Sequence, residues 1–312
     1  MALLDRALVQ LLPAMPRQVV RRISSRYIAG DHLADATATV RALNEQRKLA
    51  TIDVLGEEIT TEAETHAIDR AYEDVLSEIA RRHLAANVSV KPTALGLGLD
   101  YELCRQNLTR LLGFARIRGN FVRVDMEDAT TTDATLQLYR ELRAQGYDNL
   151  GIVLQASLKR TVADVDALAP LRPNVRLCKG IYVESPRIQY RDDGAVRTSF
   201  VRSLEALFDA HCYAGIATHD DFLIIQAERI VQERQLSRDE YEFQMLLGVR
   251  PELGNKVVAR YHKLRIYVPF GAYWYEYSLR RLQENPSIAG YIASDTVGRV
   301  LHPRRNGSSL TV

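Results

Sequence analysis

The chain has 312 residues, of which 46% are hydrophobic and 26% are charged, values that are ordinary for a globular protein with a sizeable core. They exclude a disordered chain, a collagen-like repeat and a coiled-coil rod. With 41 basic and 39 acidic residues, the net charge of +2 gives no electrostatic reason to expect a nucleic-acid partner. The basic residues comprise 35 Arg and only 6 Lys, so a lysine at a strand end stands out.

The compartment follows from the cysteines and from the hydrophobic pattern. Cys104, Cys178 and Cys212 show no C-x-x-C spacing, which favours a reducing compartment over a disulfide framework. No run of 18 apolar residues predicts a membrane-spanning helix. Residues 1–15 suit a short amphipathic helix that packs on the domain, and contact with a membrane surface is the alternative. We therefore predict a cytoplasmic protein, with peripheral attachment at the inner face of the membrane as a variant of that prediction.

In chain order, helical patterns come first. A stretch at residues 19–23 leads to a break at Gly30, and a second runs from His32 to about Gln46, so we assign residues 1–46 to an N-terminal helical arm. Eight short β-branched runs then recur about 23 to 40 residues apart, which is enough for a strand, a loop and a helix each. The eight predicted strands are residues 50–55, 88–90, 121–124, 151–154, 175–177, 215–217, 241–245 and 264–268.

The repeating units predict an α/β fold. Eight units within about 245 residues favour a (β/α)₈ TIM-like barrel over 47–300, and an open doubly wound sheet is the competing arrangement. Helix-like stretches at residues 199–209 and 220–234 lie between predicted strands. The polar residues 301–312 form a C-terminal tail.

Polar or ionisable residues end nearly every predicted strand. In a parallel barrel these strand ends converge on the C-terminal face, where active sites form, so the pattern indicates an enzyme. The strand-end residues are Gly56-Glu57, Lys91, Asp125, Gln155, Lys179-Gly180, Thr218-His219, Gln244 and Pro269-Phe270-Gly271.

Structural and functional interpretations of the cations in and after the strands stay open at this point. Arg176 lies inside a strand, where it forms either a salt bridge in the barrel interior or a cation beside a cofactor or anionic intermediate. Lys91 and Asp125 end neighbouring strands and so could touch, which fits a structural ion pair, substrate binding or a Schiff-base lysine. His219 has no second histidine at ligand spacing, so we predict no metal site.

A pair of arginines follows the eighth predicted strand. On a helix, Arg280, Arg281 and Glu284 lie near one face, because they are three and four residues apart. A solvated ion-pair surface is the ordinary interpretation. Placed at a barrel mouth, the two guanidiniums would instead form a bidentate clamp for a small carboxylate.

Several motifs resemble those of proline dehydrogenases. The string at 176–182, RLCKGIY, resembles their RLVKGAYW signature, and that at 242–246, EFQML, resembles a second segment. The string RIYVPFG at 265–271, followed by RRLQEN at 280–285, resembles RVYVPYG…RRLxEN. Segments 51–57 and 151–156 fit as well. These motifs are collinear over nearly the whole predicted barrel, and the length suggests the monofunctional bacterial form.

The resemblance implies a distorted (β/α)₈ barrel that holds FAD. It implies oxidation of L-proline to Δ1-pyrroline-5-carboxylate, with hydride passing to N5 of the flavin and electrons then passing to a quinone. Asp125 and Arg176 would be catalytic, with Arg176 beside N5. Arg280 and Arg281 would clamp the proline carboxylate with help from Lys91.

The resemblance also implies the remaining roles. Tyr267, with Leu246 or its neighbours, would wall the proline ring, and Glu57 would pair with Arg280 as a gate. The residues implied to line FAD, besides Arg176, are Met126, Gln155, Lys179, Gly180, Ile181, Thr218, His219 and Glu284.

Four residues depart from the family pattern as we expect it. They are Cys178 for an aliphatic residue, Ile181 for a small residue, Val183 for Trp, and Asp220 for Asn. None belongs to the substrate clamp, so the departures bear on cofactor packing rather than on the activity. Three alternatives remain: a flavin-dependent barrel for another cyclic amine such as hydroxyproline, a Schiff-base lyase using Lys91 or Lys179, and a non-catalytic binding protein.

Overall fold

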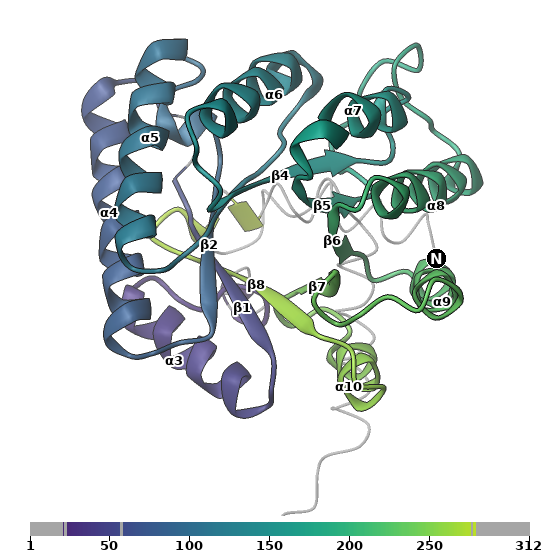
Figure 1. Ribbon diagram of the computed structural model, residues 1–312. Helices are drawn as coiled ribbons and strands as arrows, with labels where there is room; N and C mark the ends of the chain where they lie inside the picture. Colours follow the sequence, from purple (N-terminus) through teal and green to yellow (C-terminus); the bar gives the residue numbers. More distant parts are fainter. Residues whose placement is uncertain (1–20, 22–23, 57–58, 276, 279–312) are drawn as a thin grey trace, which may run out of the picture. The chain divides into compact units, whose positions relative to one another are not determined.

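A computed structural model describes residues 21, 24–56, 59–275, 277 and 278 (Figure 1). The predicted gate Glu57 and the predicted clamp and cofactor residues Arg280, Arg281 and Glu284 lie outside the described residues. The helix predicted for residues 1–15 and the tail 301–312 lie outside them too. Ser25–Trp274 form one compact unit, which holds all eight strands.

The eight strands form a closed, all-parallel barrel in the order of the sequence. The strands are β1 (Leu49–Val54), β2 (Ala86–Val90), β3 (Val122–Val124), β4 (Leu150–Gln155), β5 (Asn174–Cys178), β6 (Tyr213–Ala217), β7 (Tyr241–Leu246) and β8 (Leu264–Phe270). Pairing of β1 with β8, from Leu49↔Arg265 to Val54↔Phe270, closes the barrel. The predicted barrel is therefore confirmed, and the open sheet is excluded.

Helices lie around the outside of the barrel; α3 precedes β1, and the others connect successive strands (Figure 1). They are α3 (Leu33–Glu45), α4 (Glu62–Arg81), α5 (Tyr101–Ile117), α6 (Ala129–Ala144), α7 (Thr161–Leu168), α8 (Asp193–Asp209), α9 (Asp221–Glu233) and α10 (Pro251–Ala259), with short 3₁₀ turns at Thr93–Leu95 and Ala169–Leu171. The described part of the chain contains no helix that is both long and apolar enough to cross a membrane.

Aspartates begin four of these helices. Asp100, Asp128, Asp192 and Asp220 accept hydrogen bonds from backbone N–H groups in the first turns of α5, α6, α8 and α9. Each cap follows a βα loop, so the caps lie at the C-terminal face of the barrel. The helix predicted for residues 199–209 begins earlier, at Asp193, directly after the Asp192 cap.

Helix α3 packs against β1 and β8, and it buries Ala36, Thr37 and Val40. Residues 33–45 therefore cover the seam where the barrel closes. The boundaries that we predict between arm, barrel and tail stay a prediction.

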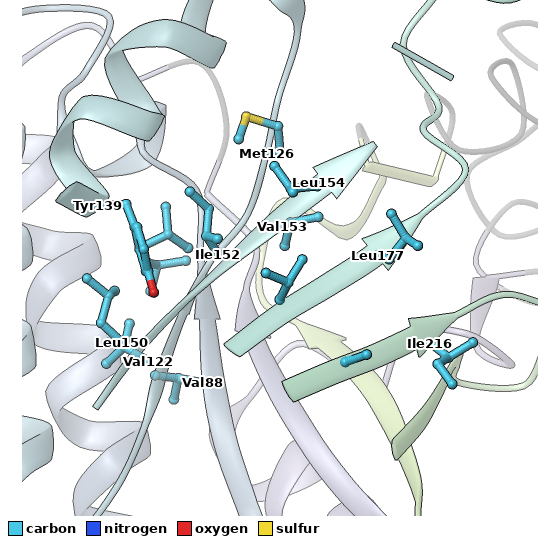
Figure 2. Close-up of a cluster of buried hydrophobic side chains, with 14 of the residues drawn as sticks. Val88, Val122, Met126, Tyr139, Leu150, Ile152, Val153, Leu154, Leu177 and Ile216 are labelled. Carbon is cyan, nitrogen blue, oxygen red and sulfur yellow. The ribbon is translucent and has the colours of Figure 1, made fainter. Parts of the chain in front are cut away.

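Alternation along the strands separates an apolar layer from a polar one. Val88, Val122, Ile152, Leu177 and Ile216 are buried in the layer between strands and helices (Figure 2). The alternate positions face the barrel interior, as shown by side-chain hydrogen bonds that cross it, and several of these positions carry charge. Interior-facing polar residues with such bonds are Ser89, Arg123, Arg176 and Gln244.

One helix side chain completes the barrel where β1 and β2 separate. The β1–β2 register ends at Asp53↔Ser89, and beyond it the Tyr72 hydroxyl of α4 stands between the two strands. It accepts from the Val54 N–H at 3.2 Å and lies 2.7 Å from the Ser89 carbonyl, to which it donates. The hydroxyl therefore replaces a missing ladder bond between two buried strands.

Replacing Tyr72 by Phe should lower the free energy of unfolding by about 1–3 kcal/mol, because it leaves a buried N–H and a buried carbonyl without their bridge. Urea denaturation of Tyr72→Phe measures this loss. Tyr139→Phe is the matched control, since its hydroxyl has only a 3.3 Å bond from Arg143. Equal losses of unfolding free energy in the two variants would contradict a stabilising role for the Tyr72 bridge between β1 and β2.

Candidate active site

Arg176 is the centre of the polar group at the barrel mouth. Its Nη1 donates to Asp125 Oδ1 at 2.6 Å and to the Ser89 hydroxyl at 3.1 Å, while its Nε donates to Gln244 Oε1 at 2.6 Å. The guanidinium carbon lies 5.2 Å from the ring centre of Tyr267. An Arg buried among these groups is tolerated because a carboxylate compensates its charge.

Asp125 ties together residues from three strands. Its Oδ1 accepts from Arg176 and from the Ser89 hydroxyl at 2.7 Å, and its Oδ2 accepts from the Tyr267 hydroxyl at 2.9 Å. The structure thus brings together three predicted site residues from β3, β5 and β8. The interior salt bridge that we considered for Arg176 exists, and its partner is Asp125, while the catalytic role of both residues stays a prediction.

Lys91 pairs with Asp53, an acid that was not predicted to belong to the site. Its Nζ lies 2.9 Å from Asp53 Oδ2 on the neighbouring β1. Asp53 is fully buried, and burial raises its pKa, while the Lys91 ammonium opposes that rise. The sequence does contain a signal for this pair: Asp53 is the one acid in the apolar strand β1, and a buried acid needs a cation or a hydrogen-bond donor as a partner.

Gly180 allows a tight approach at the end of β5. Its φ is +96°, and a Cβ there would lie 2.5 Å from Ser157 Oγ and 2.9 Å from Gln155 Oε1. Gln155 Nε2 donates to the Glu127 carbonyl at 2.8 Å, which fixes its amide. The positive φ and the close side chains favour glycine at this position, so the loop after β5 packs tightly on Ser157 and Gln155.

Two cations share one carboxylate beside this loop. Lys179 Nζ lies 2.6 Å from Asp220 Oδ2, and Arg197 Nε lies 2.8 Å from the same oxygen. Although burial opposes ionisation, the bonds from Arg197 and Lys179 hold the pKa of Asp220 at about 2. The cluster therefore carries one net positive charge. Arg197 was not predicted, because it lies on α8 away from any strand end.

His219 and Thr218 follow β6 and are held by the backbone. His219 Nε2 accepts from the Leu246 N–H at 2.9 Å, and the His219 carbonyl accepts from Arg250 at 2.8 Å. Burial, and then the Arg250 charge, lower the pKa of His219 from the usual 6.5 to about 4. A ring nitrogen that accepts a backbone N–H is not available to a metal ion, and the described residues contain no cluster of three metal-ligating side chains.

The remaining predicted cofactor residues lie on the same loops. Met126 is buried directly after Asp125, and Ile181 is half-buried directly after Gly180. Among the predicted site residues that the structure describes, Arg176 and Tyr267 lie inside β5 and β8, and the others follow or end β2, β3, β4, β5, β6 and β7.

Comparisons with known proteins identify relatives over most of the chain. Residues 36–294 match the family model described as proline dehydrogenase. The chain is 35% identical over 267 residues to proline dehydrogenase 1 of Bacillus subtilis, which covers 86% of this chain and 88% of that protein. It is 34% identical over 286 residues to proline dehydrogenase of Deinococcus radiodurans, covering 89% and 91%.

A solved structure shows the same fold. Proline utilization A from Bdellovibrio bacteriovorus, inactivated by N-propargylglycine, aligns with a TM-score of 0.79 at 21% identity. The alignment covers 93% of this chain but only 37% of that longer chain.

The pKa of His219 predicts a pH dependence of stability. The folded protein holds the ring neutral down to about pH 4, whereas the unfolded chain takes up a proton near the usual 6.5. Its contribution is therefore fully present above about pH 6.5 and is lost as the pH falls toward 4. Urea denaturation between pH 4 and 7 should show a shallower loss for His219→Gln, whose amide oxygen accepts without titrating. Replacing the exposed His211 by Gln is the control, and a slope unchanged in His219→Gln would contradict the assignment.

Proposed function

Because the chain belongs to the proline dehydrogenase family, we propose that it oxidises L-proline to Δ1-pyrroline-5-carboxylate, with FAD as the bound oxidant and a quinone as the final electron acceptor. The observation that carries the proposal is the cluster of Asp125, Arg176 and Tyr267 at the C-terminal face of the barrel. The cluster lies on the same face of the barrel as the cations Lys179 and Arg197, whose charge suits the pyrophosphate of a flavin dinucleotide.

The residues at the mouth fit FAD. The dinucleotide carries a pyrophosphate, and the Lys179–Arg197–Asp220 cluster supplies a net positive charge with N–H donors. Gly180 lets the loop after β5 pack on Ser157 and Gln155 beside this cluster. Arg176 would hold the reactive end of the flavin, and the residues that would hold the rest of the cofactor are Met126, Gln155, Lys179, Gly180, Ile181, Thr218 and His219.

Lys91 and Tyr267 would bind the substrate. Lys91 is largely buried, and its ammonium, fixed by Asp53, offers a cation for the proline carboxylate. Tyr267 is held by its bond to Asp125, so its ring forms a rigid wall for an apolar pyrrolidine ring. Arg280 and Arg281 would complete the carboxylate clamp, with Glu57 as the gate.

The chain's own residues supply position and electrostatics. When bound, FAD supplies the two-electron acceptor for the hydride from the substrate. Both oxygens of Asp125 are already engaged, so Asp125 acts by holding Arg176 and Tyr267 in one geometry rather than as a free base. The proline amine must lose a proton before its hydride leaves, so turnover should rise with pH. We also propose peripheral contact with the membrane, where a quinone is found.

The alternative of a Schiff-base lyase that uses Lys91 or Lys179 is less well supported. A Schiff-base lysine must be neutral to attack a carbonyl, and carboxylates stabilise the charged ammonium instead. Lys91 and Lys179 each lie within 2.9 Å of an aspartate oxygen. These ion pairs disfavour a nucleophilic role for either residue.

The visible absorbance spectrum of the purified protein, recorded before and after anaerobic addition of L-proline, tests the proposal. We expect flavin bands that bleach with L-proline but not with D-proline or lactate. Flavin bands that L-proline leaves unchanged would keep the cofactor and reject the substrate. A colourless protein that FAD cannot reconstitute would reject both and favour the lysine chemistry.

A further inference from the structure

We propose that Glu242 and Gln244 of β7 are positioning residues that fix the Arg176 guanidinium and thereby set the electron affinity of the bound flavin. The inference rests on the proposed function, because it concerns how the same site is held. Both residues lie on β7 (Tyr241–Leu246), and their side chains bond to each other. Neither of them contacts the substrate in this proposal.

The first link lies deep in the barrel. Arg265 of β8 binds Glu242 with two parallel hydrogen bonds, from Nε to Oε1 at 2.6 Å and from Nη2 to Oε2 at 3.0 Å. Arg265 Nη1 also donates to the Ala50 carbonyl of β1 at 2.7 Å. Burial opposes the ionisation of Glu242, but the charges of Arg265 and Arg123 and the hydrogen bonds from Arg265 and Gln244 together lower its pKa. An ionised carboxylate can only accept hydrogen bonds.

The second link is the Gln244 amide, which has a donor end and an acceptor end. Its Nε2 donates to Glu242 Oε1 at 2.7 Å, so its Oε1 must face the other way, where it accepts from Arg176 Nε at 2.6 Å. Flipping the amide would place oxygen against carboxylate and NH₂ against guanidinium, and both contacts would be repulsive. The orientation is therefore determined by Glu242 rather than by Gln244 alone.

Gly215 of β6 provides the space for this amide. A Cβ at Gly215 would lie 2.5 Å from Gln244 Nε2 and 3.1 Å from its Cδ. Its φ is not in the left-handed region, so alanine is compatible with the backbone. A methyl group there would displace the amide without removing any hydrogen-bonding group.

These links leave Arg176 one orientation. Gln244 fixes Nε, and Asp125 and Ser89 fix Nη1, whereas Nη2 has no acceptor among the described residues. Nη2 would therefore be available to the cofactor. A cation held beside the flavin would stabilise the electron-rich reduced form more than the oxidised one. Releasing Nε would let the guanidinium turn toward Asp125 and weaken that preference.

Gln244→Met tests the inference, because methionine has a similar volume and makes neither hydrogen bond. We expect a roughly tenfold loss of preference for the reduced flavin, which is about 30 mV of reduction potential for a two-electron couple. A chemical reductive titration against a reference dye measures the potential without proline. Gly215→Ala should lower the potential in the same direction, and Glu242→Gln should do so by allowing the amide to flip.

The matched control is Thr51→Val, which removes a different buried hydrogen bond, to Asn87, from the same barrel interior. An unchanged potential in Gln244→Met or Gly215→Ala, or an equal shift in Thr51→Val, overturns the inference. If L-proline fails to bleach the wild-type flavin while the potentials shift as expected, the proposed substrate is wrong and the positioning role stands. If the wild-type protein binds no FAD, both proposals fall.

Discussion

The site depends on an ion pair that the barrel encloses, Arg176 with Asp125. Removing two charges from water costs several kcal/mol each, so such a pair persists only where further hydrogen bonds satisfy both groups. Ser89, Gln244 and Tyr267 provide these bonds. The pair therefore requires polar residues at matching heights on β2, β7 and β8, and this requirement shapes the interior faces of those strands.

The same constraint explains the other charges in the barrel. Lys91 pairs with Asp53 between β1 and β2, and Arg265 pairs with Glu242 between β7 and β8. Arg123 instead donates to the carbonyls of Ile152 and Asn174 and to the Asn174 side chain, and burial lowers its pKa to about 9. Each of these buried cations thus binds partners from other strands, so the polar interior cross-links the barrel.

The fold could be predicted from the sequence because short β-branched runs recur along the chain. The spacing between these runs leaves room for one helix each, so the number and order of strands follow. The start of α8 at Asp193 was missed, although Asp192 caps it and Val196 is buried four residues before Phe200. The prediction that the sheet closes into a barrel depended on the count of eight strands rather than on any local sequence signal.

The site was predicted less completely, for a physical reason. A strand end in a barrel has two neighbours, and the sequence does not say which of them supplies the counter-charge. Lys91 pairs with Asp53 on one side, whereas Asp125, on the other side, binds Arg176. Arg197 could not be found, because only the folded chain brings α8 beside the end of β5. Asp220, the expected departure from Asn, is the residue that joins Arg197 to Lys179.

We propose that the Asp125–Arg176 pair holds the groups that oxidise proline in one geometry. The most direct measurement is the single-turnover rate at which saturating L-proline reduces the bound flavin in Asp125→Asn, compared with the wild-type protein. We predict a rate lower by about tenfold or more, because a charged hydrogen bond of this kind contributes about 1.5–3 kcal/mol, while the flavin is retained. A wild-type rate in Asp125→Asn, with full flavin content, would contradict the account.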